Sequence, residues 1–193
     1  MKVGFIAEGG CERIVLRSSA FQTHLVKLGV EQVGDVIDID GKGNLKQSSQ
    51  RMQSQVQTLR NQGAQWVIVL RDLDEPGSAG AVAKVKAEVY QADDIITCLA
   101  IQELEAWFLA DSAVLSRLFG VLIVCEFPQL IQKPSDYLND LRMNYQGRGI
   151  RDKKGFASTL VNNGFTIESA AQHPNCPSAL YFLTKLQTLA SAN

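Results

Sequence analysis

Apolar residues along the chain form short continuous runs that alternate with longer stretches of helical spacing. The continuous runs predict four strands, at residues 3–7, 33–39, 66–70 and 95–101. The third run, WVIVL, is apolar at every position, which is typical of a strand buried on both faces of a parallel sheet.

Helical periodicity fills the segments between these runs. Apolar residues three or four positions apart predict helices over residues 12–28, around 52–59 and over 82–89. Strands that alternate with helices in this way favour an α/β fold, with a mostly parallel sheet flanked by helices on both faces.

The pattern changes after residue 102, where helical spacing dominates. It predicts helices over about 104–118, 134–141, 156–161 and 177–190. Residues 121–125 form an apolar run of ambiguous type, and the glycine- and cation-rich segment 144–156 predicts a loop. We therefore expect a single domain over residues 1–193, with an α/β core over about 1–118 and a helical C-terminal third over about 126–193.

Acidic residues end all four predicted strands: the second ends in Asp38 and Asp40, and the other three supply the candidate site residues. Glu8 follows the first strand, Asp72 and Asp74 follow the third, and Glu103 and Glu105 follow the fourth. Parallel strands end at the same edge of a sheet, which is the edge where open α/β folds bind ligands. Side chains two residues apart in an extended chain point to the same side, so Asp72 and Asp74 are expected to converge.

Such a gathering of acids indicates a metal site. Clustered carboxylates repel one another unless a cation lies among them, and Mg²⁺, with Mn²⁺ as an alternative, suits oxygen ligands and bridges them to substrate phosphates. Two ions could activate a water and stabilise the leaving oxygen of a phosphodiester. Acids at strand ends are also common as turn and cap residues, so a single one would not indicate a function. Three such sites at one edge of the sheet favour a metal centre.

Composition limits how a polyanion could bind. The chain has 19 Lys and Arg against 20 Asp and Glu, so it lacks the basic field that drives nonspecific nucleic-acid binding. Metal ions or a local patch must then hold the phosphates. Segment 144–156 offers either such a phosphate clamp or a solvated loop; its four clustered cations are Arg148, Arg151, Lys153 and Lys154.

Cysteine usage and the N-terminus indicate the compartment. The four cysteines form no CxxC pair, which predicts free thiols in a reducing cytoplasm rather than a zinc or dithiol site. The first apolar run meets Glu8 too early for a signal peptide, and no apolar stretch approaches the roughly 20 residues of a membrane span. We expect a cytoplasmic protein without membrane contact.

Several motifs carry a family resemblance. The Glu8-Gly9 turn after the first strand, followed later by Asp72-Leu73-Asp74, resembles the TOPRIM domain of topoisomerases, DnaG-type primases and OLD-family nucleases. The segments EGGCE, GKGNL, ELEAWFLAD and CPSALYFLTKL are similar to a small bacterial TOPRIM-like family known as a domain of unknown function, over nearly the whole chain. The resemblance implies a TOPRIM-like, Rossmannoid sheet.

The resemblance also implies roles for individual residues. Glu8 would be a general acid/base or a metal ligand, and Asp72 and Asp74 would be magnesium ligands. Glu105, directly before Ala106-Trp107, matches the family glutamate better than Glu103 does. Lys153 or Lys154 would be the catalytic lysine of OLD-type nucleases, and Arg148 and Arg151 would contact phosphate. Cys11 departs from the family, where Thr or Ser is expected.

Two functions of different classes follow. The first is a magnesium-dependent nuclease acting on DNA or RNA, and the second is a noncatalytic metal- or nucleotide-binding module that acts through a protein partner, in phage defence or a toxin–antitoxin system. A receiver-like phosphoacceptor domain ranks last, because the first strand supplies a single acid. Trp107 and Phe108 share a helix with Leu104 and Leu115, which favours a place in the core over base stacking. A homodimer is a further expectation, because Trp107, Phe108, Tyr181 and Phe182 include enough large apolar groups to form one exposed face.

Overall fold

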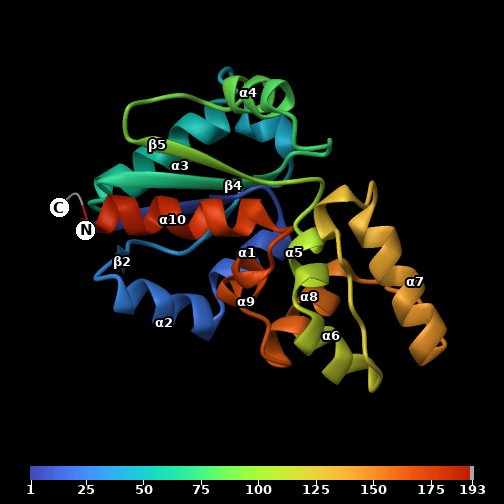
Figure 1. The fold of residues 1–193 in the computed structure, drawn as a ribbon. Helices are drawn as coiled ribbons and strands as arrows, with labels where there is room; N and C mark the ends of the chain where they lie inside the picture. The colour runs from blue at the N-terminus through green and yellow to red at the C-terminus, as the bar shows by residue number, and fades with distance from the viewer. Residues whose placement is uncertain (192–193) are drawn as a thin grey trace.

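A computed structural model describes residues 1–191 of the chain. Its sheet has the strand order β2 (Glu31–Gln32), β1 (Lys2–Ala7), β4 (Trp66–Asp72) and β5 (Ile95–Ala100), and every pairing is parallel (Figure 1). A fifth strand, β3 (Ile37–Asp38), also pairs with β1. The predicted fold class, a parallel α/β sheet with helices around it and a helical C-terminal part, is confirmed.

One predicted strand is replaced by two short pieces. Residues 33–39 were expected to form a continuous strand, but β2 pairs with the beginning of β1 and β3 with its end. Gly34, between them, has a φ of 66°, and this left-handed conformation turns the chain out of the sheet.

The helices follow the sequence pattern with three corrections, and one further helix, Ile167–Gln172, was not predicted. The predicted helix over 12–28 is two helices because the Ser18 hydroxyl accepts a hydrogen bond from the Phe21 amide and starts the second one. Asp111 divides the predicted helix over 104–118 in the same way. The predicted loop over 144–156 is reduced to residues 147–152, because helices extend into both of its ends. The helices are α1 (Gly10–Leu16), α2 (Ser19–Lys27), α3 (Gln50–Asn61), α4 (Ala79–Glu88), α5 (Glu105–Ala110), α6 (Ser112–Phe119), α7 (Pro134–Gln146), α8 (Lys153–Asn162), α9 (Ile167–Gln172) and α10 (Pro177–Ser191), with 3₁₀ turns η1 (Lys42–Leu45) and η2 (Pro128–Leu130).

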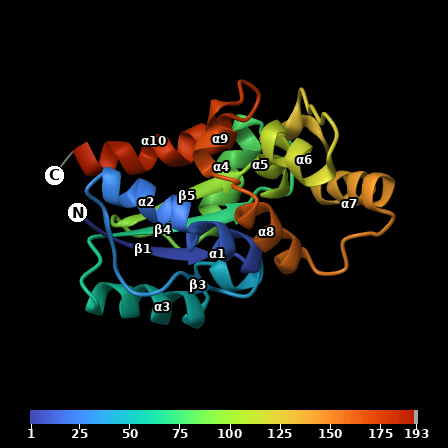
Figure 2. The same cartoon turned by 90° about the horizontal axis from the view of Figure 1, so that it is seen from below.

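Helices cover both faces of the sheet. Alternate strand residues point to opposite faces, so Phe5 joins the core under α1, α2 and α10 whereas Ile6 joins the core under α3. Figure 2 shows α3 below the sheet and α10 above it. Helices α5 to α8 lie beyond the carboxyl ends of the strands (Figure 1), so the C-terminal part of the chain forms a wall beside that edge.

Trp107 fixes this wall to the rest of the fold. The indole is fully buried, packs against Phe182 and donates a 2.7 Å hydrogen bond to the Ser178 hydroxyl, which also accepts a hydrogen bond from Gln129. Trp107 and Phe182, like Phe108, lie in the core, so the predicted aromatic face is not exposed. The homodimer itself stays a prediction.

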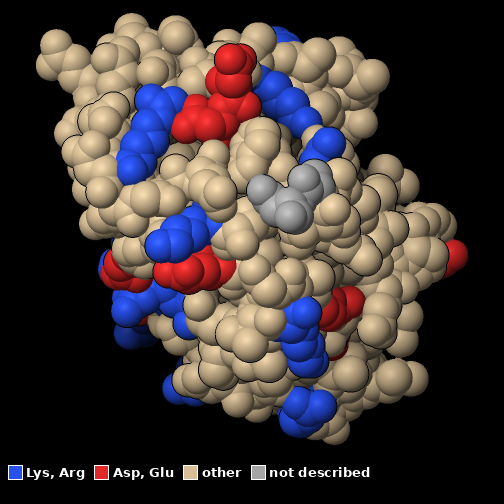
Figure 3. All heavy atoms as spheres, turned by 90° about the vertical axis from the view of Figure 1, so that its left-hand side faces the viewer, with Lys and Arg blue, Asp and Glu red and all other residues tan. Residues whose placement is uncertain are grey.

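The surface is mixed in charge. Figure 3 shows that acidic and basic side chains are interspersed on the face that carries the chain ends, without a broad basic patch there. Within residues 1–191, no helix combines the length and apolar character that crossing a membrane requires.

Removing the Ser178 hydroxyl should destabilise the protein. In Ser178→Ala the buried Trp107 indole N–H loses its acceptor, and an unsatisfied buried donor costs about 1–3 kcal/mol. Urea unfolding measures this loss, with the exposed Ser48→Ala as the control. Equal free energies of unfolding for both variants would contradict the anchoring role of this contact.

Candidate functional site

Three strands turn in the same unusual way at their carboxyl ends. Asp40, Asp74 and Gln102 each lie two residues beyond the end of β3, β4 and β5, and each has a φ near +60°. These are the non-glycine residues with positive φ among residues 1–191. Backbone strain of this kind costs about 1–3 kcal/mol per residue and clusters at functional sites.

A cavity of about 250 Å³ opens at this edge, and we call it the carboxylate cleft. Five of the predicted site residues line it: Glu8, Asp72, Glu105, Lys153 and Lys154. Glu12, Asp38 and Asp40 complete its charged lining, together with Cys11 and the glycines at positions 9, 10 and 41. Strand ends and helices far apart in sequence therefore deliver acids to one place.

Asp72, the last residue of β4, lines the cleft. Its Oδ1 accepts a 2.7 Å hydrogen bond from the backbone N–H of Leu104. Burial, followed by repulsion from Glu12, Glu105 and Glu8, raises its pKa well above the usual range. An ionised Asp72 is therefore unfavourable here unless positive charge enters the cleft.

Sequence reasoning did not select three acids of the cleft, Glu12, Asp38 and Asp40, and Glu12 is the most buried of them. It is 5% exposed, and its Oε2 accepts a 3.1 Å hydrogen bond from the Gly9 N–H at the start of α1. Burial and the neighbouring Glu8 and Glu105 raise its pKa to about 7. A signal was present, because Glu8 and Glu12 are four residues apart within EGGCE and a helix starts between them.

Glu8 faces a buried cation from the next strand. Its Oε2 lies 3.3 Å from Arg71 Nε, yet it has no partner in hydrogen-bond geometry. Burial raises the pKa of Glu8, Arg71 opposes this shift and Asp74 adds to it. Glu8 thus keeps a free acceptor oxygen in the cleft.

Asp74 does not converge with Asp72, contrary to the expectation from an extended chain. The strand ends at Asp72, and the left-handed backbone of Asp74 directs its carboxylate to Lys42, 3.2 Å away. Asp74 is not among the residues that line the cleft, although its charge still acts on Glu8. Its role as a magnesium ligand stays a prediction.

The two glutamates after β5 have different tasks. Glu103 accepts hydrogen bonds from the backbone N–H and the hydroxyl of Ser135, and so holds the first turn of α7. Glu105 instead lies in the cleft, with its Oε1 3.6 Å from Lys153 Nζ. The structure therefore separates a capping glutamate from a cleft glutamate.

Lys153 and Lys154 begin α8 rather than a loop. Partial burial opposes the charge of Lys153, but Glu105 and Glu103 outweigh it and raise the pKa of the ammonium group. Lys154 lies over Gly10 and reaches to 3.7 Å from Asp38; a Cβ at Gly10 would be 2.1 Å from Lys154 Cε. Glycine at this position therefore makes room for the lysine.

The predicted phosphate contacts lie elsewhere. Arg148 and Arg151 are exposed on segment 147–152, outside the lining of the cleft. Their role stays a prediction. Cys11 does line the cleft, but burial and the adjacent acids raise its pKa to about 12, so its sulfur remains a thiol.

The oxygen ligands of the cleft suit a hard cation, but they are not arranged closely around a single position. Within residues 1–191, no three His, Cys, Asp or Glu side chains are arranged closely enough to hold an ion. The carboxylate oxygens are nevertheless the ligand type that Mg²⁺ prefers. Burial and mutual repulsion raise the pKa values of these acids, and a bound cation would oppose that shift.

Comparison with known proteins identifies a family. A model described as "Domain of unknown function (DUF4276)" matches residues 11–187. The chain belongs to this family. No curated protein matches. Among solved structures, the C-terminal region of the Burkholderia pseudomallei OLD protein is similar at 14% identity and a TM-score of 0.46, covering 95% of this chain and 96% of that one. The predicted membership of a domain-of-unknown-function family is thus confirmed.

The raised pKa of Glu12 predicts a pH-dependent stability. From its ordinary value of 4.5 up to about 7, the folded protein holds a proton that the unfolded chain has lost, so the free energy of unfolding falls as pH rises through this interval. Glu12→Gln cannot ionise and should be more stable than the native protein at pH 8 by roughly 1–3 kcal/mol.

Urea unfolding at pH 5 and pH 8 in chelator tests this. The exposed Glu88→Gln is the control for the same chemical change. The difference between Glu12→Gln and the native protein must grow with pH, whereas a constant difference would refute the buried ionisable state.

Proposed function

We propose that this protein is a magnesium-dependent phosphodiesterase that acts on nucleic acid, that is, a nuclease. The observation that carries the proposal is the carboxylate cleft, in which Glu8, Glu12, Asp72 and Glu105 meet at the carboxyl edge of a parallel sheet beside Lys153. The TOPRIM-like motifs of the sequence support the same class of reaction. Whether the substrate is DNA or RNA is a question for the assay.

Each charged group of the cleft has a role in this proposal. Asp72 with Glu12 or Glu105 would hold Mg²⁺, with waters as its other ligands, and the ion when bound supplies charge neutralisation for the phosphate and a water of lowered pKa. Glu8, with its buried unpartnered oxygen and raised pKa, is the proton acceptor for the attacking water. Lys153 stays protonated beside Glu105, so it donates to a phosphate oxygen rather than removing a proton.

One observation favours a second function, a noncatalytic module that works through a protein partner. The segment between α6 and α7 exposes large apolar side chains, among them Leu122 at 82%, Val124 at 65% and Leu130 at 72%. Exposed apolar side chains so close together mark interaction surfaces. Under this reading the cleft binds a metal, and cleavage requires the partner.

A cleavage assay tests the first function. Labelled single- and double-stranded DNA and RNA are incubated with the protein in Mg²⁺, Mn²⁺ or chelator. Asp72→Asn and Glu8→Gln should abolish metal-dependent cleavage, and Lys153→Met should lower its rate by about 10²–10³, the usual effect of removing one transition-state donor. The exposed Lys133→Met is the matched control. Cleavage that survives Asp72→Asn at full rate would refute the proposal.

Metal binding can be measured without activity. At pH 8 the melting temperature of the native protein should rise with Mg²⁺, because a ligand at one hundred times its Kd adds about 2.7 kcal/mol. Asp72→Asn should lose this response and be more stable than the native protein in chelator, since it removes a buried repulsive charge. The exposed Asp136→Asn should behave like the native protein. A magnesium response unchanged in Asp72→Asn would place the ion elsewhere.

A further inference from the structure

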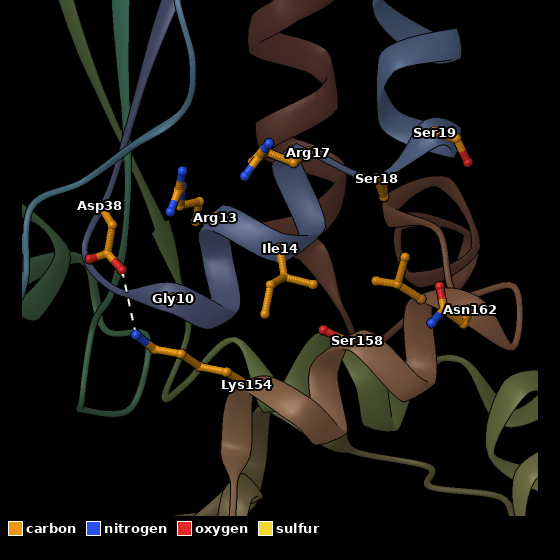
Figure 4. A pocket seen from close by; sticks show the side chains of 11 residues that line it. Gly10, Arg13, Ile14, Arg17, Ser18, Ser19, Asp38, Lys154, Ser158 and Asn162 are labelled. Carbon is orange, nitrogen blue, oxygen red and sulfur yellow. Dashed lines mark ion pairs between the residues drawn. The ribbon is translucent and has the colours of Figure 1, made fainter.

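A second, larger cavity lies directly beside the carboxylate cleft. It has a volume of about 750 Å³ and runs between α1 and α8 (Figure 4). Arg13 and Arg17 line it from α1 and its end, and Lys154, Ser158 and Asn162 line it from α8. We call it the basic groove.

The basic groove and the carboxylate cleft are continuous. Gly10, Asp38 and Lys154 line both cavities. In Figure 4, the Lys154 side chain extends below Gly10 to Asp38, at the junction of the two. A chain-like ligand could therefore occupy both cavities at once.

The lining of the basic groove is suited to phosphates rather than bases. It combines three cations and one acid, Asp38, with hydroxyl and amide groups, and Ile14 and Val161 form its apolar part. None of the residues that line it, all within the described chain, is aromatic. Bases stack on aromatic side chains, whereas Arg, Lys, Ser and Asn contact phosphate and sugar without reading sequence.

The two arginines are held in place by one carboxylate. Arg13 Nη2 lies 2.7 Å from Asp35 Oδ2, and Arg17 Nε lies 3.1 Å from Asp35 Oδ1. Arg13 Nε also donates a 3.0 Å hydrogen bond to the Val36 carbonyl. Two cations therefore share one anion, which leaves net positive charge and free N–H donors at the groove.

We propose that the basic groove binds the sugar–phosphate backbone of a single nucleic-acid strand and leads it into the carboxylate cleft. This rests on the proposed function and adds the form of the substrate. The volume lies within the roughly 300–1,000 Å³ of ordinary ligand pockets, which is enough for a short stretch of one strand to lie between α1 and α8. Recognition is independent of sequence, since the contacts reach only the backbone.

The test measures binding rather than cleavage. Fluorescence anisotropy of a labelled single-stranded oligonucleotide, as DNA and as RNA, is recorded in chelator, with the matching duplex in parallel. Arg17→Gln should weaken single-strand binding about tenfold, the effect of one charge-assisted hydrogen bond. It should also reduce the slope of log K against log salt by about 0.7. Lys27→Gln, which changes the net charge equally from an exposed site on α2, should bind like the native protein.

A variant with the opposite effect sharpens the test. Asp35→Asn releases both arginines from their carboxylate, so it should bind the single strand several-fold more tightly and with a steeper salt dependence. A variant that failed to fold would not bind the single strand more tightly, so this result cannot arise from misfolding.

The outcomes separate this inference from the nuclease proposal. If Arg17→Gln and Lys27→Gln bind alike while the native protein still cleaves, the groove is not the strand path and the proposed function stands. If the duplex binds as tightly as the single strand, the single-strand assignment is overturned. If the native protein neither binds nor cleaves any of the nucleic acids, both proposals fall.

Discussion

The repulsion among buried carboxylates is the constraint on which this site depends. Parallel strands bring Glu8 and Asp72 to one edge, and the helices that follow add Glu12 and Glu105. Each acid receives partial compensation, from the N–H groups of Gly9 and Leu104 and from the cations Arg71 and Lys153. The compensation is incomplete, since all four acids keep raised pKa values. The remaining repulsion lowers the stability of the folded protein, and it also makes the cleft a place where added positive charge is favourable.

Sequence patterns predicted the fold because the central strands are locally unambiguous. The apolar runs of β1, β4 and β5 have no helical alternative at their length, and parallel connectivity follows from the helices between them. The errors arose where one residue interrupts a longer pattern, such as Gly34 in the divided edge strand and Ser18 between α1 and α2. Helix α9, only six residues long, is too short for periodicity to reveal.

The position of the site could be predicted from the sequence, but the directions of its side chains could be predicted only in part. The strand ends identify Glu8 and Asp72, but a backbone angle that no sequence pattern encodes turns Asp74 away. Lys153 and Lys154 were predicted to lie in a loop, but they form the start of α8. In this position Lys153 reaches Glu105 and Lys154 reaches Asp38. Glu12 becomes a cleft residue only because α1 begins directly after the glycines.

The charges of the two cavities complement each other in the proposed binding of a nucleic-acid strand. A chain with 19 basic and 20 acidic residues attracts a polyanion only where cations are concentrated, and an acidic cleft by itself would repel it. The cations of the basic groove offset this repulsion at the point where a strand would enter, and Lys154 lies at the boundary between the two cavities. In the proposed mechanism, contacts along the groove would therefore hold a phosphate near the carboxylates, and neutralising the reacting group would fall to Lys153 and the proposed Mg²⁺.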